Sequence, residues 1–404
     1  MADPWTWASA VSLAIWLYLM LGRAGFWRAH MRLERDLPTP ATWPEVVVVV
    51  PARNEADVIG ESLASLLAQD YPGRFSIVVV DDASTDGTAE AARATRSATS
   101  ETAVEIVVGD GPALGWTGKL WALEQGLCRA RTSVPDATFV WFSDADIFHG
   151  RDILRRLVAK AEADSRDLVS LMVRLHCAGL WERLLIPAFV FFFQMLYPFA
   201  ATADPRKSAA GAAGGCLLVR RAALERAGGL APIRGDLIDD CALAQAVKST
   251  GGRLWLGLGE DSYCIRAYDG LGGIWALIAR GAYSQLRFSP VLLAGTVAGM
   301  VVTYLVPPVT VIAGALGSWG AAASLATGAW GLMCISYQPT LAYYRQPWYM
   351  SPLLPLVAGL YMMATGDSAR RHWRGRGAAW KGRHYAPGPN RAETNLTRQR
   401  RDRR

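Results

Sequence analysis

The sequence predicts an α/β fold in which an open, mostly parallel sheet is flanked by helices and joined to transmembrane helices. Short β-branched runs at residues 46–50 and 77–80 are typical of strands buried on both faces. Segments with a helical spacing of apolar residues alternate with these runs, which favours a parallel sheet. Long uncharged stretches at residues 5–22 and 288–344 are typical of membrane spans.

The first uncharged stretch, residues 5–22, is about long enough to cross a bilayer as one helix. Four arginines follow it: Arg23, Arg28, Arg32 and Arg35. Because no small-residue cleavage site is obvious, we interpret residues 1–40 as an anchor and a basic linker. Positive charge after the span places the next domain in the cytoplasm, at the bacterial inner (plasma) membrane.

Residues 41–287 are predicted to form that cytoplasmic domain. Its expected strands are at 46–50, 77–80, 104–108 and 138–142. One helix is expected between the first two strands, beginning near residue 59. A second follows the strand at 77–80 and ends near residue 94, and a third covers 119–130. In open α/β sheets, ligands bind beyond the carboxyl ends of the strands. Polar residues that directly follow a strand are therefore the candidate site residues.

Two polar motifs follow the first two strands, namely Pro51-Ala52-Arg53-Asn54-Glu55 and Asp81-Asp82. Carboxylates at these strand ends can accept hydrogen bonds from a ribose hydroxyl or a base imide. Each motif, taken alone, is equally typical of a loop that caps the next helix.

The triplet Asp144-Ala145-Asp146 follows the strand at 138–142. Two carboxylates at this spacing can hold Mg²⁺ or Mn²⁺ and leave coordination positions for a diphosphate. Aspartate pairs are also common at ordinary turns, so the triplet gains meaning only from its neighbours.

Two further motifs complete the set. One is Gly115-Trp116-Thr117-Gly118-Lys119, whose glycines let the backbone come close to a ligand and whose lysine can bind a phosphate as a positive charge. Ala113 and Leu120 break the Walker pattern, and the first strand is not followed by GxGxxG, which excludes both nucleotide-binding loops. Asp239-Asp240 opens an apolar helix and is either a partner of the helix dipole or a general base.

The remaining apolar segments divide into two groups. Residues 288–366 are predicted to form a C-terminal membrane region of two to three helices, the first kinked by Pro307-Pro308. Residues 346–366 either span the membrane or are re-entrant, and we favour the second because it keeps the basic tail, residues 367–404, inside. The segment at about 180–203 is expected to lie in the membrane interface, since a crossing at residues 184–203 would separate Asp144-Ala145-Asp146 from Asp239-Asp240.

Charge and cysteine content bound the possible partners. The 404 residues carry a net charge of +7, and residues 370–404 hold twelve Lys and Arg against two Asp and Glu. This tail suits an anionic membrane surface, while residues 398–404 lack the interleaved aromatics of nucleic-acid binders, so no nucleic-acid partner is expected. The six cysteines form no CxxC motif and are expected to be reduced.

As a set, these motifs resemble the family 2 inverting glycosyltransferases with the GT-A fold, over roughly residues 44–290. The matching segments read VVVVVPARNE, VVVDDASTDGT, GKLWALEQG, FSDAD, GGCLLVRRAAL and IDDCAL. The arrangement of spans, and the tail motifs at 373–377 and 380–383, are similar to the branch associated with hopanoid and carotenoid lipids.

The resemblance implies a role for each matching residue. Nucleotide-sugar contacts would come from Pro51, Arg53, Glu55, Asp81, Asp82, Lys119 and Asp144. Asp146, with Asp144, would hold Mg²⁺ or Mn²⁺; Gly214 and Gly215 would form the acceptor-side loop; and Asp240, next to Asp239, would be the base. The implied activity is transfer of a sugar, from a UDP-sugar, to a lipid acceptor in the membrane.

Processive polysaccharide synthases carry a Q/R-x-x-R-W motif after the base, and here Ser284 and Phe288 stand at its first and last positions. This departure favours transfer of a single sugar. Arg280 and Arg287 are candidates for contacts with the diphosphate or, equally, for anchors at the interface. The alternatives that stay open are a processive synthase and a non-catalytic nucleotide-binding membrane scaffold.

Overall fold

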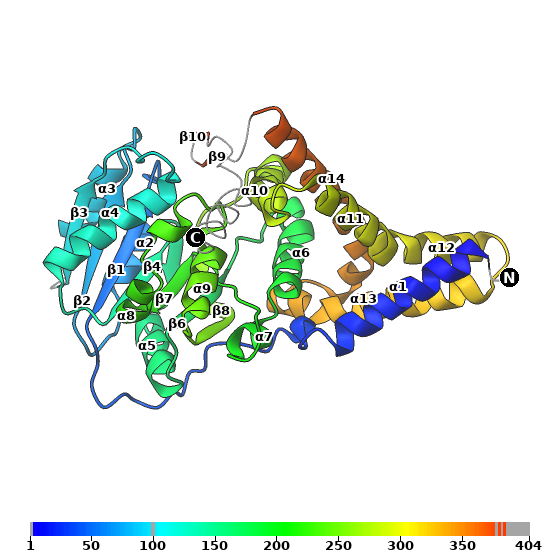
Figure 1. The fold of residues 1–404 in the computed structure, drawn as a ribbon, viewed down its shortest axis with the longest axis horizontal. Coiled ribbons are helices and arrows are strands. Elements are labelled where there is room, and N and C mark those ends of the chain that lie inside the picture. The colour runs from blue at the N-terminus through cyan, green and yellow to red at the C-terminus, as the bar shows by residue number, and fades with distance from the viewer. Residues whose placement is uncertain (1–2, 98–101, 376–378, 381–382, 385–404) are drawn as a thin grey trace, which may run out of the picture.

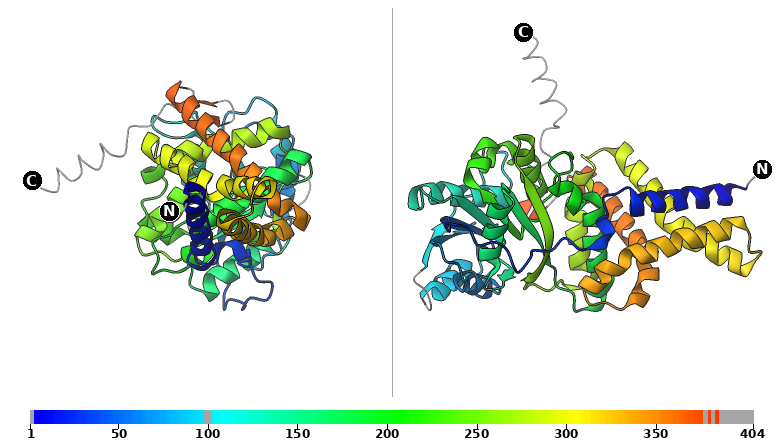
Figure 2. Two further views of the ribbon diagram at one scale, coloured as in Figure 1. Left: turned by 90° about the vertical axis from the view of Figure 1, so that its right-hand side faces the viewer. Right: turned by 90° about the horizontal axis from the view of Figure 1, so that it is seen from below.

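The computed structural model describes residues 3–97, 102–375, 379–380 and 383–384. A domain built on a sheet lies at one end and a bundle of helices projects from the other (Figure 1). Two further views show the same division (Figure 2). Most of the predicted basic tail, residues 385–404, lies outside the described residues.

The described residues form one eight-stranded sheet with the order β3-β2-β1-β4-β7-β6-β8-β5. The strands are β1 Val46–Ala52, β2 Phe75–Asp81, β3 Ala103–Val108, β4 Phe139–Ser143, β5 Ile147–His149, β6 Leu168–Arg174, β7 Cys216–Arg220 and β8 Leu254–Cys264. β3, β2, β1 and β4 are parallel, as are β6 and β8, whereas β7 and β5 run antiparallel to their neighbours. The predicted mostly parallel α/β sheet is therefore confirmed, with two reversed strands that the sequence did not reveal.

The helices connect these strands and continue into the projecting bundle. They are α1 Pro4–Leu21, α2 Ile59–Leu67, α3 Thr88–Ser97, α4 Gly118–Ser133, α5 Ile153–Ala163, α6 Leu180–Leu196, α7 Phe199–Ala203, α8 Arg221–Arg226, α9 Asp239–Ser249, α10 Gly270–Gln285, α11 Pro290–Met300, α12 Val306–Leu316, α13 Ala321–Tyr343 and α14 Leu354–Trp373. Shorter elements are the 3₁₀ helices η1 Phe26–Arg28, η2 Ala231–Ile233 and η4 Trp348–Leu353, the π-helix η3 Val301–Leu305, and a hairpin of β9 Ala379–Trp380 and β10 Arg383–His384.

The central strand β1 is buried on both faces, as its run of valines predicts. Val48 packs into a core with α2 and α5, whereas Val49 packs into a core with α4 and α9 on the opposite face. A Cβ on Gly126 of α4 would lie 2.5 Å from Cγ1 of Val49, so only glycine lets α4 approach this closely. Helices on both faces leave the strand ends as the open edge of the sheet.

The apolar segment at 180–203 forms α6 and α7 and packs inside the protein. Ile186 and Phe191 are fully buried in a core shared with α10, α13 and α14. Large exposed apolar side chains occur only at its ends, at Leu180, Trp181 and Leu196. Packing within the chain accounts for much of the apolar character of this segment, and its expected position at the membrane interface stays a prediction.

The projecting bundle consists of α1, the continuous rod α11–η3–α12 and α13, and we call it the helical arm. Within the described residues, Pro4–Leu21 and Pro290–Leu316 are long and apolar enough to cross a membrane, judged on length and composition. α13 packs against both α1 and α12 and carries no charged residue. The N-terminus and the α12–α13 turn lie at the same far end of the arm (Figures 1 and 2).

A buried side-chain hydrogen bond replaces a backbone hydrogen bond that two prolines remove from the rod. The carbonyl of Thr303 would normally accept from residue 307 in an α-helix or residue 308 in a π-helix, and both are prolines without an N–H. Nε1 of Trp16 donates to this carbonyl over 2.9 Å instead. The predicted kink at Pro307-Pro308 thus takes the form of a π turn that α1 satisfies.

Residues 346–366 do not form an isolated span. They fold into η4 and most of α14, which continues to Trp373 and packs against α10. Its last turns carry Asp367, Arg370 and Arg371, and α14 is not among the candidate spans of the described residues.

Candidate active site

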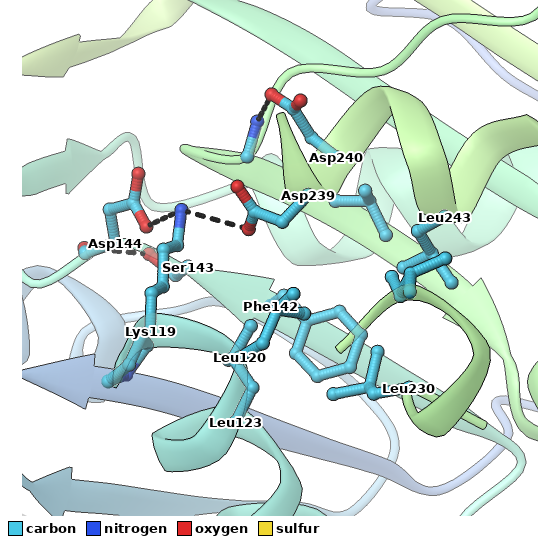
Figure 3. A pocket seen from close by; sticks show the side chains of 14 residues that line it. Lys119, Leu120, Leu123, Phe142, Ser143, Asp144, Leu230, Asp239, Asp240 and Leu243 are labelled. Carbon is cyan, nitrogen blue, oxygen red and sulfur yellow. Dashed lines mark hydrogen bonds and ion pairs between the residues drawn. The ribbon is translucent and has the colours of Figure 1, made fainter. Parts of the chain in front are cut away.

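A depression opens where the carboxyl ends of β1 and β4 meet the N-termini of α4 and α9 (Figure 3). β7 runs antiparallel to β4 and pairs Cys216 with Ser143, so the loop before β7 lies beside the residue that follows β4. The depression measures about 340 Å³ and is lined by Pro51, Lys119, Leu120, Leu123, Phe142, Ser143, Asp144, Gly214, Leu217, Leu230, Ile233, Asp239, Asp240 and Leu243. Four of the predicted motifs therefore share one site.

Lys119, at the start of α4, connects two of the predicted carboxylates (Figure 3). Its Nζ lies 2.8 Å from Oδ1 of Asp144 and 3.4 Å from Oδ2 of Asp239. Burial acts to lower the pKa of Lys119, but the charges of Asp144 and Asp239 outweigh it and raise the pKa. Lys119 therefore keeps a positive charge in the depression at any physiological pH.

Asp240 is held by two backbone N–H groups, one on each carboxylate oxygen. Gly214 donates to Oδ2 over 2.8 Å and Cys241 donates to Oδ1 over 2.7 Å. Burial and, after it, the charge of Asp239 raise the pKa of Asp240 to about 6, while Lys119 acts in the opposite direction. A carboxylate with such a pKa is a better proton acceptor than an ordinary one and is still ionised near neutral pH.

Asp146 lies at the turn before β5, beside the end of β8, because Ile147 pairs with Cys264. Ile265 donates its N–H to the carbonyl of Asp146 over 2.8 Å. Nε of Arg266 lies 4.0 Å from Oδ2 of Asp146. Arg266 was not predicted from the sequence, since its carboxylate partners come from remote segments.

A buried histidine supports the turn between Asp144 and Asp146. His149 lies 2.9 Å from Oγ of Ser143 through Nε2 and 3.0 Å from Oγ of Ser262 through Nδ1. Burial lowers the pKa of His149 to about 3, so the imidazole is neutral and suited to hydrogen bonding with two hydroxyls. His149 thereby fixes the end of β4 from which Asp144 projects.

The loops after β1 and β2 are connected through Arg53. Its Nη1 donates to the carbonyls of Asp82 and Ala83 and lies 4.0 Å from Oδ2 of the buried Asp82. Oδ1 of Asp81 accepts the N–H of Ser84 over 3.1 Å, which is the turn-forming role considered for this motif. Glu55 is buried in the same loop, next to Arg266.

The carboxylates suit a cation that takes other ligands from a bound anion. The described residues contain no group of three or more His, Cys, Asp or Glu that could hold a metal ion unaided. Asp144 and Asp146 offer a small set of hard oxygen ligands, which is the set that Mg²⁺ or Mn²⁺ uses when a diphosphate completes its coordination. The residues present therefore fit the predicted metal.

The other predicted residues divide between the depression and the surface. Gly214 lies in the depression, where a Cβ would be 3.0 Å from Nζ of Lys119, and Gly215 packs against Val173. Arg280 and Arg287 are exposed and do not line the depression.

The C-terminal residue of α10, Gln285, is connected through Tyr197 to the residue that follows the proposed base. Gln285 donates to the hydroxyl of Tyr197 over 2.7 Å, and Tyr197 in turn interacts with the thiol of Cys241, next to Asp240. Phe288 stacks on His372 of α14 with a ring separation of 4.5 Å.

Comparison with known sequences shows what the sheet domain is similar to. Residues 47–228 match the profile of glycosyl transferase family 2. Over 114 residues the chain is 34% identical to the 4,4'-diaponeurosporenoate glycosyltransferase of Staphylococcus aureus, and over 50 residues it is 44% identical to an N-acetylglucosaminyltransferase of Mesorhizobium japonicum. These segments cover 28% and 12% of this chain and only 27% and 12% of the curated relatives.

Among solved structures, the chain is similar to a mannosyltransferase from Pyrobaculum calidifontis in complex with GDP-Man and Mn²⁺. The TM-score is 0.55 at 25% identity, over 90% of this chain and 99% of that one. The likeness extends well beyond residues 47–228, and thus beyond the segment that the family profile matches.

Proposed function

We propose that this chain, whose residues 47–228 match the profile of glycosyl transferase family 2, transfers one sugar from a nucleotide-sugar to a lipid acceptor with inversion at the anomeric carbon. The observation that carries this proposal is the convergence of Lys119, Asp144, Asp239 and Asp240 in one depression at the strand ends. The positive charge of Lys119 can stabilise the leaving group, and the carboxylate of Asp240 can accept the proton of the attacking hydroxyl.

Each side chain has a defined task in the proposed reaction. Asp240 accepts the proton of the acceptor hydroxyl as that oxygen attacks the anomeric carbon. Lys119 places a permanent positive charge where the departing diphosphate gains negative charge. Asp146, with Asp144, would hold Mg²⁺ or Mn²⁺, which when bound neutralises the diphosphate as a Lewis acid. Pro51, which lines the depression, lies where the donor would enter.

Two alternatives are left for the donor. The relative from Pyrobaculum calidifontis is described with GDP-Man, whereas the family resemblance implied a UDP-sugar. The loop of Arg53 and Asp82 at the ends of β1 and β2 is where the nucleoside would bind in either case. Parallel assays with both nucleotides separate these possibilities.

A membrane position for the helical arm supports a lipid acceptor. Trp5 and Trp7 on α1 and Trp319 in the α12–α13 turn are exposed at the far end of the arm, and Tyr18, Trp348 and Tyr349 are exposed nearer the sheet domain. Exposed tryptophans and tyrosines at two levels are typical of the two interfaces of a bilayer. Three crossings, by α1, α11–α12 and α13, would put the sheet domain and the C-terminal tail on the same, cytoplasmic side.

The acceptor that we propose is a polyisoprenoid-derived lipid such as a hopanoid. The tail motifs near residues 373 and 380 and the span arrangement are similar to that branch of the family, and one relative is named for glycosylating 4,4'-diaponeurosporenoate. Departure from the processive motif at Ser284 and Phe288 supports addition of a single sugar.

The experiment uses purified full-length protein in lipid nanodiscs with labelled UDP-glucose, UDP-N-acetylglucosamine and GDP-mannose, Mn²⁺, and a lipid extract. Asp146→Asn is expected to abolish metal-dependent donor binding, whereas Asp240→Asn retains donor binding and loses transfer. Mass spectrometry of the labelled lipid counts the sugars added. Near-normal turnover by Asp240→Asn would refute the base assignment, and a polymeric product would refute single transfer.

A further inference from the structure

Arg266 joins three carboxylates from two segments of the chain, the loop after β1 and the turn before β5. It makes a bidentate ion pair with Asp57, with both N···O distances at 2.9 Å, and a second ion pair with Glu55. Its Nε lies 4.0 Å from Oδ2 of Asp146. Asp57 and Glu55 follow β1 and Asp146 precedes β5, so Arg266 bridges the nucleotide side and the metal side of the site.

We propose that Arg266 binds the diphosphate of the nucleotide-sugar, opposite Lys119. The inference rests on the proposed function, because it assumes a nucleoside diphosphate donor. It gives Arg266 the diphosphate contact for which the sequence offered Arg280 and Arg287. None of the three arginines lines the depression, but Arg266 lies 4.0 Å from the predicted metal ligand Asp146, whereas Arg280 and Arg287 are exposed.

The donor groups of Arg266 fit this task. Nη1 and Nη2 are engaged by Asp57 and Glu55, but the buried Nε makes no hydrogen bond within the described residues. A buried guanidinium N–H without an acceptor costs free energy, and phosphate oxygens are among the acceptors that arginine binds best. Because Nε lies 4.0 Å from Oδ2 of Asp146, a diphosphate that met a metal on Asp146 would lie close to this N–H.

Charge balance gives the second argument. A divalent cation on Asp146 would repel a guanidinium that lies 4.0 Å from the same carboxylate. A diphosphate between them turns that repulsion into two attractions, since its oxygens bind the cation on one side and Arg266 on the other. Metal and nucleotide should therefore bind together more favourably than either alone.

The loop that carries Arg266 is fixed on both sides, so the guanidinium is positioned in advance. Before it, Ile265 donates to the carbonyl of Asp146 over 2.8 Å. After it, Tyr268 donates its N–H over 2.8 Å to the buried Glu182. Although burial opposes ionisation, hydrogen bonds from Gly179, Tyr268 and His176 hold the pKa of Glu182 at about 2, so this anchor keeps its charge.

The test measures ligand binding by full-length protein in nanodiscs with saturating Mn²⁺. UDP and GDP are titrated calorimetrically, and uridine and guanosine, which lack phosphate, are followed by ligand-observed NMR. Arg266→Gln is expected to weaken binding of the preferred diphosphate by about tenfold or more, as expected for a lost charge-assisted hydrogen bond. Binding of the matching nucleoside should stay within about twofold, and Arg266→Lys should recover part of the loss.

The matched control is Arg129→Gln, which removes an exposed ion pair with Glu105 outside the site. It should leave both ligands unaffected. Unchanged diphosphate binding by Arg266→Gln, or an equal loss of diphosphate and nucleoside, would overturn the proposal in favour of a purely structural ion pair. If the unaltered protein bound neither UDP nor GDP with Mn²⁺, the proposed function itself would fail, which is a distinct result.

Discussion

The backbone N–H of Gly214 donates to Oδ2 of Asp240 over 2.8 Å, and the same glycine lies against Nζ of Lys119. Gly214 thus contacts both Asp240, the proposed base, and the ammonium group of Lys119. The contact exists because β7 runs antiparallel to β4, which brings the loop before β7 to the carboxyl end of β4. The reversed strand is therefore what completes the site.

Gly214→Ala should reduce transfer while leaving the fold intact. Its Cβ would lie 3.0 Å from Nζ of Lys119, and the flexible lysine can move away from Asp144 at little cost in stability. We expect kcat to fall by about tenfold or more, because a misplaced cation no longer meets the developing charge. Gly111→Ala, at an exposed site where a Cβ meets nothing within 4 Å, is the control. Equal kcat for the two variants would contradict this role of Gly214.

The pH profile should report the ionisation of Asp240. The base acts only when ionised, so kcat/KM should fall as pH drops through about 6, the pKa to which burial and Asp239 raise this carboxyl. Asp239→Asn removes a neighbouring negative charge and should move this acidic limb to lower pH. Asp136→Asn, at an exposed position outside the depression, should leave the limb in place. A limb that stays near pH 6 in Asp239→Asn would argue against Asp240 as the titrating group.

Ser170 of β6 should determine how firmly the loop with Gly214 is held. Its buried Oγ accepts the N–H of Ala213 over 2.9 Å and lies 3.0 Å from the carbonyls of Ala213 and Cys216. Ser170→Ala leaves these groups without their partner, which should cost about 1–3 kcal/mol of unfolding free energy. Thermal unfolding of the detergent-solubilised protein measures the loss. The exposed Ser249 donates to a helix carbonyl, and its alanine variant should change stability little.

The sequence predicted the first four strands of the sheet, β1 to β4, because local patterns determine them. Strands such as β1 are short β-branched runs, and each is followed by turn residues and a helical pattern, so type and order could be read in sequence. The other four strands, β5 to β8, were not predicted, and their pairing could not be, because contacts between distant segments leave no periodic signal. Lys119 and Asp240 were found from motifs, whereas their shared depression depends on that pairing.

Arg266 shows where motif reasoning ends. It stands 211 positions from Glu55 along the chain, and nothing in its neighbours marks it as part of a site. The apolar segment that became α6 is a different case. Its composition suggested the membrane interface, but hydropathy does not distinguish contact with lipid from burial under α10, α13 and α14.

Trp16→Phe should destabilise the helical arm without affecting donor binding. The indole N–H is the donor that replaces Pro307 and Pro308 at the carbonyl of Thr303, and phenylalanine keeps the apolar ring but not the hydrogen bond. Ser12 also donates to this carbonyl, but over a longer distance of 3.5 Å, so loss of the indole N–H should cost about 0.5–1.5 kcal/mol and lower the melting temperature of the solubilised protein. Trp7→Phe, at an exposed position on the same helix, is the matched control and should melt like the unaltered protein. Identical melting of the two variants would mean that the π turn is satisfied in another way, and that α1 packs against the rod through apolar contacts alone.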